Sequence, residues 1–272
     1  MPCGTACIEP CTRDGRGSGP APHDLSINLR PPTQRLQLGD THRRRRSLSS
    51  PRPTFGVAGI AYSYQRTATG GTAPYPSTLA SGSLPTGLKL SATKGTLTGT
   101  PAAAGSWTFS LKVTDSSNPT KQTVTASMTM QIYSRAADGS GTETVSPQTA
   151  TRGSSGNVFV LTYTAPPSGA LENGKLRITV PTGWTAPSTI ATSAGLVTTS
   201  NGAIAASSQT INISIRVAPG ATLTITYGSH GERAAGATVS SKAGTYTFTT
   251  KECSSGNGTL TSISGSPTVA VS

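Results

Sequence analysis

Hydrophobic and polar residues alternate in short runs from Phe55 to the C-terminus, and a period of two is typical of β-strands. One face of residues 107–113 carries only large apolar side chains, namely Trp107, Phe109, Leu111 and Val113. The other face carries Thr, Ser and Lys, so this run predicts a strand with one buried face. Similar runs lie at residues 61–64, 88–90, 124–132, 157–164, 175–180, 211–217, 223–227, 245–249 and 269–271. No segment shows the 3.6-residue period of an amphipathic helix.

Clusters of Gly, Pro, Asn and Ser separate these runs. In the turn at residues 84–87, Pro85 presets the backbone and Gly87 allows a positive φ, while Pro101 ends the strand that follows. The fold class predicted is all-β, with two tandem immunoglobulin-like antiparallel β-sandwiches preceded by a disordered tail. We place the tail at 1–54, the first sandwich at 55–134 and a second β-sandwich repeat module at 135–272. Residues 135–141 are short and polar, which indicates a linker.

Residues 1–54 contain no Phe, Trp or Tyr, are rich in Gly, Pro, Arg and Ser, and lack periodicity. This composition predicts a disordered basic tail. Its charge run at residues 42–46 could also bind phosphates. The abrupt change of composition at Phe55 favours a third interpretation, in which the tail is a misassigned start or frame-shifted sequence joined to the middle of a larger gene.

Charge and composition favour a surface rich in Ser and Thr over a nucleic-acid interface. Charged residues make up 12% of the chain, and the net charge of +12 divides into +5, +4 and +3 over residues 1–54, 55–134 and 135–272. Because the charge is spread out, we do not expect nucleic acid as a partner. No apolar run approaches the ~20 residues of a membrane span. The N-terminus shows no signal peptide.

The modules offer little material for catalysis, and we expect no enzyme activity. Cys3, Cys7 and Cys11 lie in the tail, so Cys253 is the only thiol of the modules and no disulfide can form within them. His230 is their single histidine, and both it and Cys253 are expected in loops. Five acids serve residues 135–272, which leaves few carboxylate pairs for glycoside hydrolysis.

The first module resembles the "Putative Ig domain" family of bacterial surface proteins, which is related to cadherin-like domains. The resemblance covers about 80 residues and rests on the order and spacing of the motifs at residues 59–63, 68–75, 82–90, 95–101, 104–109 and 113–116. One departure is visible, because Pro76-Ser77-Thr78-Leu79 stands where the family places an aromatic-led strand. The second module looks like repeat domains of large secreted bacterial proteins, through the motifs at residues 180–187, 219–228 and 243–248.

This resemblance implies one candidate metal site. Cadherin-like relatives can hold calcium between modules, and Asp115 stands where the family carries an Asp after Val-Thr. Calcium prefers several oxygen ligands, and the nearest further acids are Asp138 and Glu143 in the predicted linker. The alternative is that Asp115 forms a turn by binding backbone groups. No other cofactor is expected.

Two tryptophans are candidate sugar-stacking platforms. Trp107 lies on the apolar face of its strand, which indicates the core. Trp184 follows a Pro-Thr-Gly turn and is expected to be partly exposed, so it is the candidate ligand-binding residue.

The resulting hypothesis is a non-enzymatic structural or adhesive module pair from a bacterial cell-surface or secreted protein, as a fragment of a longer tandem array. The resemblance implies an extracellular or cell-surface location. The expected partners are neighbouring Ig-like modules and surface glycans or proteins. The alternative hypothesis is a carbohydrate-binding accessory module of an exported hydrolase.

Overall fold

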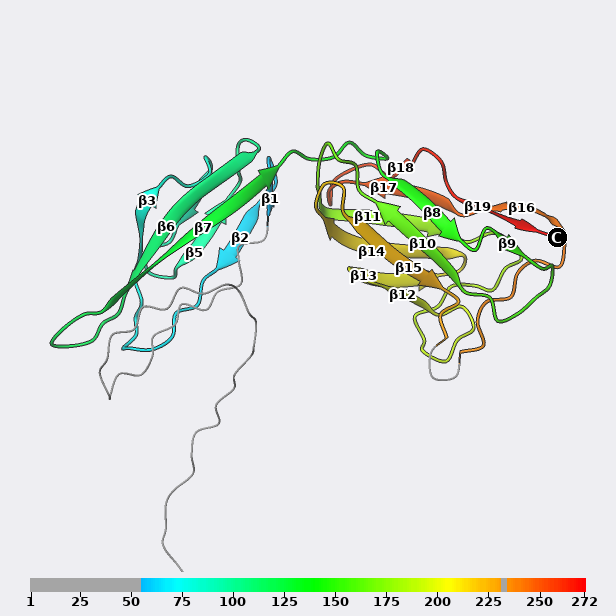
Figure 1. Cartoon of the computed structure of the whole chain (residues 1–272), viewed down its shortest axis with the longest axis horizontal. Coiled ribbons are helices and arrows are strands. Elements are labelled where there is room, and N and C mark those ends of the chain that lie inside the picture. Colours follow the sequence, from blue (N-terminus) through cyan, green and yellow to red (C-terminus); the bar gives the residue numbers. More distant parts are fainter. Residues whose placement is uncertain (1–54, 231–233) are drawn as a thin grey trace, which may run out of the picture. The chain divides into compact units, whose positions relative to one another are not determined.

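The computed structural model describes residues 55–230 and 234–272, and every regular element in these ranges is a β-strand (Figure 1). The all-β class predicted from the alternation is therefore confirmed. The predictions for residues 1–54 lie outside the described residues. Within the described part, no helix is long and apolar enough to cross a membrane.

The first module contains two sheets. Strands β1, β7, β6 and β3 form one sheet in that order, and β2, β5 and β4 form the other. The long hairpin of β6 and β7 is antiparallel, whereas β1 pairs with β7 in parallel. The bounds are β1 (Gly56–Val57), β2 (Tyr62–Gln65), β3 (Ser77–Gly82), β4 (Leu88–Leu90), β5 (Thr96–Gly99), β6 (Gly105–Thr114) and β7 (Thr123–Tyr133).

The core of the first module takes side chains from both of its sheets. Phe109 and Leu111 of β6 are 1% exposed, as the alternation predicts. Trp107 is only partly buried and packs at the rim of this core, against the backbone of Gly105. The other buried residues of this core are Tyr62, Tyr64, Leu88, Leu97, Met130 and Ile132. The two sheets therefore form a sandwich.

Two motif glycines allow strands β4 and β5 to meet closely. Gly87 has a φ of 93°, and a Cβ placed on it would lie 2.0 Å from the carbonyl oxygen of Thr100. A Cβ on Gly99 would lie 2.1 Å from the carbonyl oxygen of Gly87. The turn at residues 84–87 thus needs glycine for its φ and for the space.

The segment that departs from the family pattern still forms a strand. β3 pairs with β6 at the edge of its sheet, with an irregular register between Leu79 and Ser81. After the buried Ser77 its residues are exposed, and Leu79 is 42% exposed. Without a leading aromatic residue, this strand is held by backbone pairing and contributes little to the core.

The second module contains three sheets. Their strand orders are β12-β15-β10-β8, β13-β14-β11-β17-β18 and β16-β19-β9, and β9 pairs with β19 in parallel. The bounds are β8 (Thr142–Ser146), β9 (Thr149–Ala150), β10 (Phe159–Thr164), β11 (Leu171–Thr179), β12 (Val197–Thr199), β13 (Ala203–Ser207), β14 (Thr210–Val217), β15 (Thr222–Tyr227), β16 (Gly244–Thr247), β17 (Thr249–Cys253), β18 (Thr261–Ser262) and β19 (Thr268–Val271).

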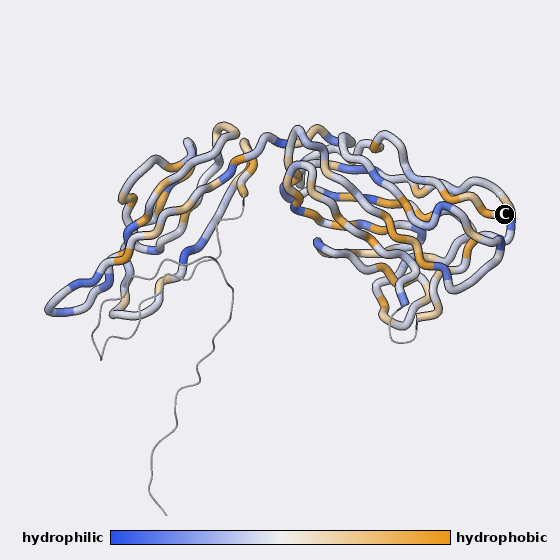
Figure 2. The backbone as a smooth tube through the Cα atoms, viewed as in Figure 1, coloured by the Kyte–Doolittle hydropathy of each residue, from blue (hydrophilic) through white to orange (hydrophobic). Residues whose placement is uncertain are grey.

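Apolar and polar residues alternate along these strands as well (Figure 2). In β14, for example, Ile211, Ile213 and Ile215 are buried. The predicted strand at residues 245–249 is instead two strands of different sheets, β16 and β17, and the fully buried Phe248 lies between them. Strands β8, β12 and β13 were not predicted, and β8 begins at Thr142, directly after the predicted linker.

Candidate functional site

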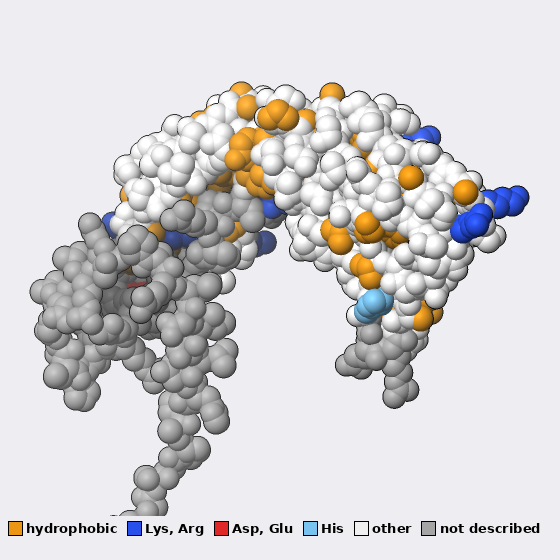
Figure 3. All heavy atoms as spheres, turned by 45° about the vertical axis from the view of Figure 1, so that its right-hand side comes forward, with side chains coloured by type: hydrophobic (Ala, Val, Ile, Leu, Met, Phe, Trp, Pro, Cys, Tyr) orange, Lys and Arg blue, Asp and Glu red, His pale blue; other side chains and the backbone are white. Residues whose placement is uncertain are grey.

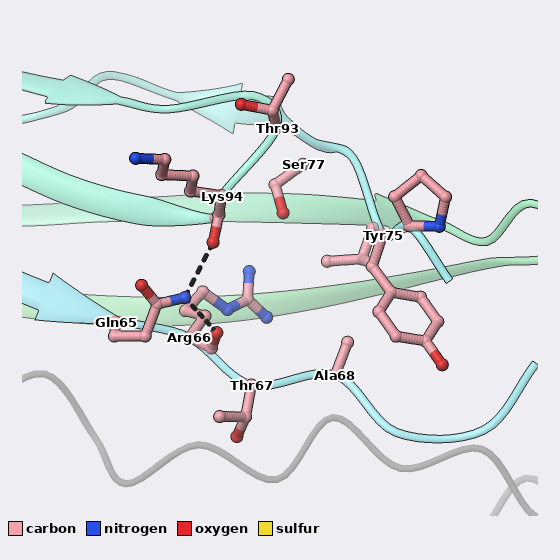
Figure 4. Close-up of a pocket in the computed structure, with 11 residues that line it drawn as sticks. Gln65, Arg66, Thr67, Ala68, Tyr75, Ser77, Thr93 and Lys94 are labelled. Carbon is pink, nitrogen blue, oxygen red and sulfur yellow. Dashed lines mark hydrogen bonds between the residues drawn. The ribbon is translucent and has the colours of Figure 1, made fainter. Parts of the chain in front are cut away.

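A cavity of about 270 Å³ opens in the first module, between the ends of strands from its two sheets. We call it the Arg66 cavity. Residues 65–68 at the end of β2, residues 93–95 before β5, and Pro74, Tyr75, Ser77 and Val113 on the side of β3 and β6 line it (Figure 4). The lining thus comes from four segments spread over residues 65–113, and the sandwich brings them together.

Arg66 is the unusual residue of this cavity. Its side chain is 6% exposed, and neither Nε nor Nη1 has a hydrogen-bond partner. Burial lowers the pKa of the guanidinium, and an electrostatic interaction with Tyr64 opposes that shift. An arginine nevertheless stays charged in proteins. The ion pair found among the described residues joins Arg216 to Glu172, so no described carboxylate neutralises Arg66.

Polar groups surround this buried charge. The side-chain Nε2 of Gln65 donates to the carbonyl oxygens of Lys94, at 2.7 Å, and Arg66, at 2.8 Å, which ties the end of β2 to the turn before β5. Lys94 is exposed and adds a second cation, and Tyr75 is half-buried. Figure 4 shows the guanidinium between the side chains of Gln65 and Tyr75, with the ammonium of Lys94 extending away from it. Such a set of donors can bind an anion, and it disfavours a metal ion.

The predicted calcium ligand lies in an adjoining hollow that shares Ala68, Tyr75 and Val113 with the Arg66 cavity. Asp115 is 5% exposed, and its carboxylate accepts hydrogen bonds from the backbone N–H of Gln122, at 2.6 Å, and the hydroxyl of Ser117, at 2.7 Å. This is the arrangement of a turn-forming aspartate.

The two acids suggested as partners of Asp115 are held elsewhere. Asp138 accepts hydrogen bonds from Ser254 and Thr259 of the second module. Burial acts to raise the pKa of Asp138, but these bonds and the charge of Arg135 outweigh it and leave the pKa lowered. Glu143 lies on β8 rather than in a linker, and it accepts from the Thr250 hydroxyl at 2.5 Å. In residues 55–230 and 234–272, no three acidic, His or Cys side chains gather where they could hold a metal ion.

The expectation that Trp184 is partly exposed is wrong. Its side chain is 3% exposed and packs against the rings of Phe159, at 4.9 Å between centroids, Phe248, at 5.5 Å, and Tyr246, at 5.8 Å. The backbone N–H of Trp184 donates to Pro181, so the Pro-Thr-Gly turn directs the indole back into the core. No face of the ring is open for stacking on a sugar.

A second group of buried polar residues, which the alternation did not reveal, lies in the second module. We call Glu143, Tyr163 and Glu252 the buried acid cluster. Glu143 on β8 is 5% exposed and lies opposite Tyr163 on β10, while Glu252 on β17 is fully buried. The backbone N–H of Gly141 donates to Glu252 Oε2 at 2.8 Å. One oxygen of each glutamate has no hydrogen-bond partner. The Tyr163 hydroxyl interacts with Glu252.

Burial changes the proton affinity of this cluster. It raises the pKa of Glu143 to about 7, although the hydrogen bond from Thr250 opposes the shift. Burial also raises the pKa of Glu252, although the interaction with Tyr163 and the hydrogen bond from Gly141 oppose this shift. Burial raises the pKa of Tyr163 as well. Because all three side chains are enclosed in the core, the cluster can take up or release protons but offers no surface to a substrate.

The two remaining candidate residues, Cys253 and His230, lie on different elements of the second module. Cys253 was expected in a loop, but it is the last residue of β17, is 1% exposed and is a free thiol. His230 is exposed in the loop after β15, as predicted. Basic side chains stand in separate small groups on the face seen in Figure 3 rather than in one stripe.

The comparisons with known proteins agree with the fold of the first module. The model of the family described as "Putative Ig domain" matches residues 46–132. The match covers the first module and agrees with the resemblance that its motifs indicated. Among curated proteins, no sequence matches the chain.

Several solved structures are similar at low identity. The endo-fucoidan hydrolase MfFcnA9 from glycoside hydrolase family 107 is 15% identical over 84% of this chain and 34% of that chain, with a TM-score of 0.37. Domains 5–6 of the S-layer protein SbsC are 12% identical over 84% and 98%, with a TM-score of 0.25. Protocadherin gammaB7 EC3-6 is 8% identical over 84% and 48%, with a TM-score of 0.30. This chain thus spans about a third of the hydrolase, and likenesses this remote carry no argument about function.

Proposed function

We propose that the two modules form a non-enzymatic structural or adhesive segment of a bacterial cell-surface or secreted protein, within a longer tandem array of such domains. The observation that carries this proposal is the family match over residues 46–132, together with the sandwich that these residues form. Neighbouring Ig-like modules and surface glycans or proteins are the proposed partners. Loops at the ends of the sandwiches and exposed strand edges would make these contacts.

The positions of the acidic side chains support a structural role. Asp115 and Asp138 each bind backbone N–H groups of a turn, which shapes the loops. Glu143 and Glu252 are enclosed in the core of the second module. In each case the side chain that could serve as an acid or a base is used within the fold, which is the pattern expected of a spacer or contact module.

The location is tested on intact cells of the source bacterium. An antibody raised against the full chain should label intact cells or recover the protein from the medium, and external protease should remove the cell-bound signal. A cytoplasmic protein serves as the control, since protease should leave it intact. If the antigen appears only after the cells are lysed, together with that control, the proposal is refuted.

The alternative, a carbohydrate-binding accessory module, needs a different binding site from the one that the sequence suggested. The buried position of Trp184 removes the expected stacking platform. The Arg66 cavity is one feature of the first module that could take a small ligand, and the groups that line it decide which ligand fits.

A further inference from the structure

The Arg66 cavity combines an unneutralised buried charge with space beside it. Two guanidinium nitrogens of Arg66 have no hydrogen-bond partner, and the cavity of about 270 Å³ lies against the same side chain. A buried charge that lacks a counter-charge is unfavourable, so buried arginines are normally paired with an anion. Among the described residues no carboxylate forms an ion pair with Arg66, since the ion pair found there joins Arg216 to Glu172. Asp115 in the adjoining hollow accepts hydrogen bonds from Ser117 and Gln122.

The charge of the cavity selects the kind of group that can fill it. Arg66 is joined by Lys94, whose exposed ammonium stands on the turn before β5. The planar guanidinium matches the geometry of a carboxylate, which it can bind through two parallel hydrogen bonds. A cation or a neutral apolar group would leave the charge of Arg66 uncompensated.

The size and remaining lining of the cavity favour a sugar as the bearer of that carboxylate. The volume is just below the range of about 300–1,000 Å³ that is common for sites of drug-sized ligands, so one ring-sized unit fits better than a folded segment. The half-buried ring of Tyr75 offers an apolar surface, while Ser77, Thr67 and Thr93 offer hydroxyls. Aromatic faces beside hydroxyls suit a ring that has apolar faces and polar edges.

We propose that the Arg66 cavity binds the carboxylate of a uronic acid unit in an acidic glycan, with Arg66 as the main anchor and Lys94 as an auxiliary cation. This inference names a ligand class for the adhesive role and so deepens the proposed function. If uronate binding fails while the protein remains on the cell surface, only the inference is refuted. If the protein is absent from the surface but binds uronates, only the proposed function is refuted.

The test uses the full chain and titration calorimetry with an oligogalacturonate. The same oligomer with its carboxyls methyl-esterified is the neutral counterpart, and a Glu-rich peptide of equal charge represents a protein partner. We expect the oligogalacturonate to bind at least about tenfold more tightly than the ester and the peptide, because a hydrogen bond to a charged group discriminates by about this factor or more. Binding should weaken with added salt.

Variants locate the binding site. Arg66→Gln should weaken oligogalacturonate binding at least about tenfold and remove the preference over the ester, while Lys94→Gln should weaken it a few-fold because exposed cations contribute less. Lys175→Gln removes an equally exposed cation from β11 of the second module and should leave binding unchanged. Nuclear magnetic resonance spectra of the wild-type chain, with backbone assignments, should show ligand-induced shifts at residues 65–68 and 93–95.

Several outcomes would overturn the assignment. No binding at millimolar oligogalacturonate, or equal binding of the ester, excludes a carboxylate site for sugars. A stronger preference for the Glu-rich peptide would show that the cavity takes a protein partner instead. Should Arg66→Gln fail to fold, the amide shifts of the wild type and the effect of Lys94→Gln still decide, since shifts confined to the second module would place the site elsewhere.

Discussion

Replacing Glu143 with Gln in the second module should make the chain more stable at neutral pH but not at acidic pH. Glu143 accepts a hydrogen bond from Thr250, and its other oxygen has no partner. The groups that face it are Thr250 of β17 and Tyr163 of β10, and Glu252 lies beside Tyr163 in the same cluster. Glutamine has the same shape and keeps the oxygen that accepts from Thr250, but it cannot carry a charge.

The magnitude follows from the pKa of Glu143. Burial raises it from 4.5 to about 7. Between these values the folded state holds a proton that the unfolded state has released, so the free energy of unfolding falls as the pH rises. The full loss is reached above pH 7, and a shift of this size corresponds to about 3 kcal/mol. The stability of Glu143→Gln relative to the wild type should therefore increase by about 3 kcal/mol between pH 4.5 and pH 8.

Urea unfolding at a series of pH values measures this difference. Trp184 lies in the core of the second module and Trp107 at the rim of the first, so tryptophan fluorescence follows both modules. Comparing variant with wild type at each pH cancels the titration of the other carboxylates. Glu172→Gln, which removes the carboxylate paired with Arg216, is the control that should not reproduce the pH dependence. A difference between Glu143→Gln and wild type that stays constant from pH 4.5 to pH 8 would refute the reasoning.

Three further changes test the packing and the turns, each by urea unfolding. Trp184→Ala should destabilise the second module by about 3–5 kcal/mol, because it empties the centre of an aromatic core, and a change below about 1 kcal/mol would mean that the indole is not buried. Asp115→Ala should cost about 1–3 kcal/mol through lost charged hydrogen bonds, with or without calcium. Gly87→Ala should cost more than Gly59→Ala, since both have a positive φ but only the Cβ at Gly87 would meet the oxygen of Thr100.

The strands that alternation predicted carry apolar residues at their inward positions. In β6, Phe109 and Leu111 are buried where the period of two places them. Strand β8 escaped prediction because its inward positions are Glu143 and Val145, and a glutamate is expected to face water. The signal was present in the spacing of these two residues, but only the structure shows that the acid shares the buried face of the valine.

The candidate sites were harder to predict for a different reason. The turn before Trp184 was visible in the sequence, but not the direction in which it sends the next side chain. The Arg66 cavity is lined by four segments spread from Gln65 to Val113. It is a candidate binding site because no described residue neutralises the buried Arg66. The burial of Trp184 and the lining of the Arg66 cavity both depend on residues distant in the sequence, so a local pattern cannot predict them. The turn-forming role of Asp115 depends on nearby residues and could be predicted.

Both modules enclose charged groups, and their surroundings imply two different ways of removing the cost. Glu143 and Glu252 face packed protein, where a proton can neutralise them, so the protonation of these two side chains at acidic pH should stabilise the second module. Arg66 cannot lose its charge in the same way, and it faces a cavity instead. An anion that binds only the folded state stabilises it by about 2.7 kcal/mol when present at 100 times its Kd. The buried glutamates of the second module can thus be neutralised by protonation, whereas Arg66 of the first module can be neutralised by a bound anion.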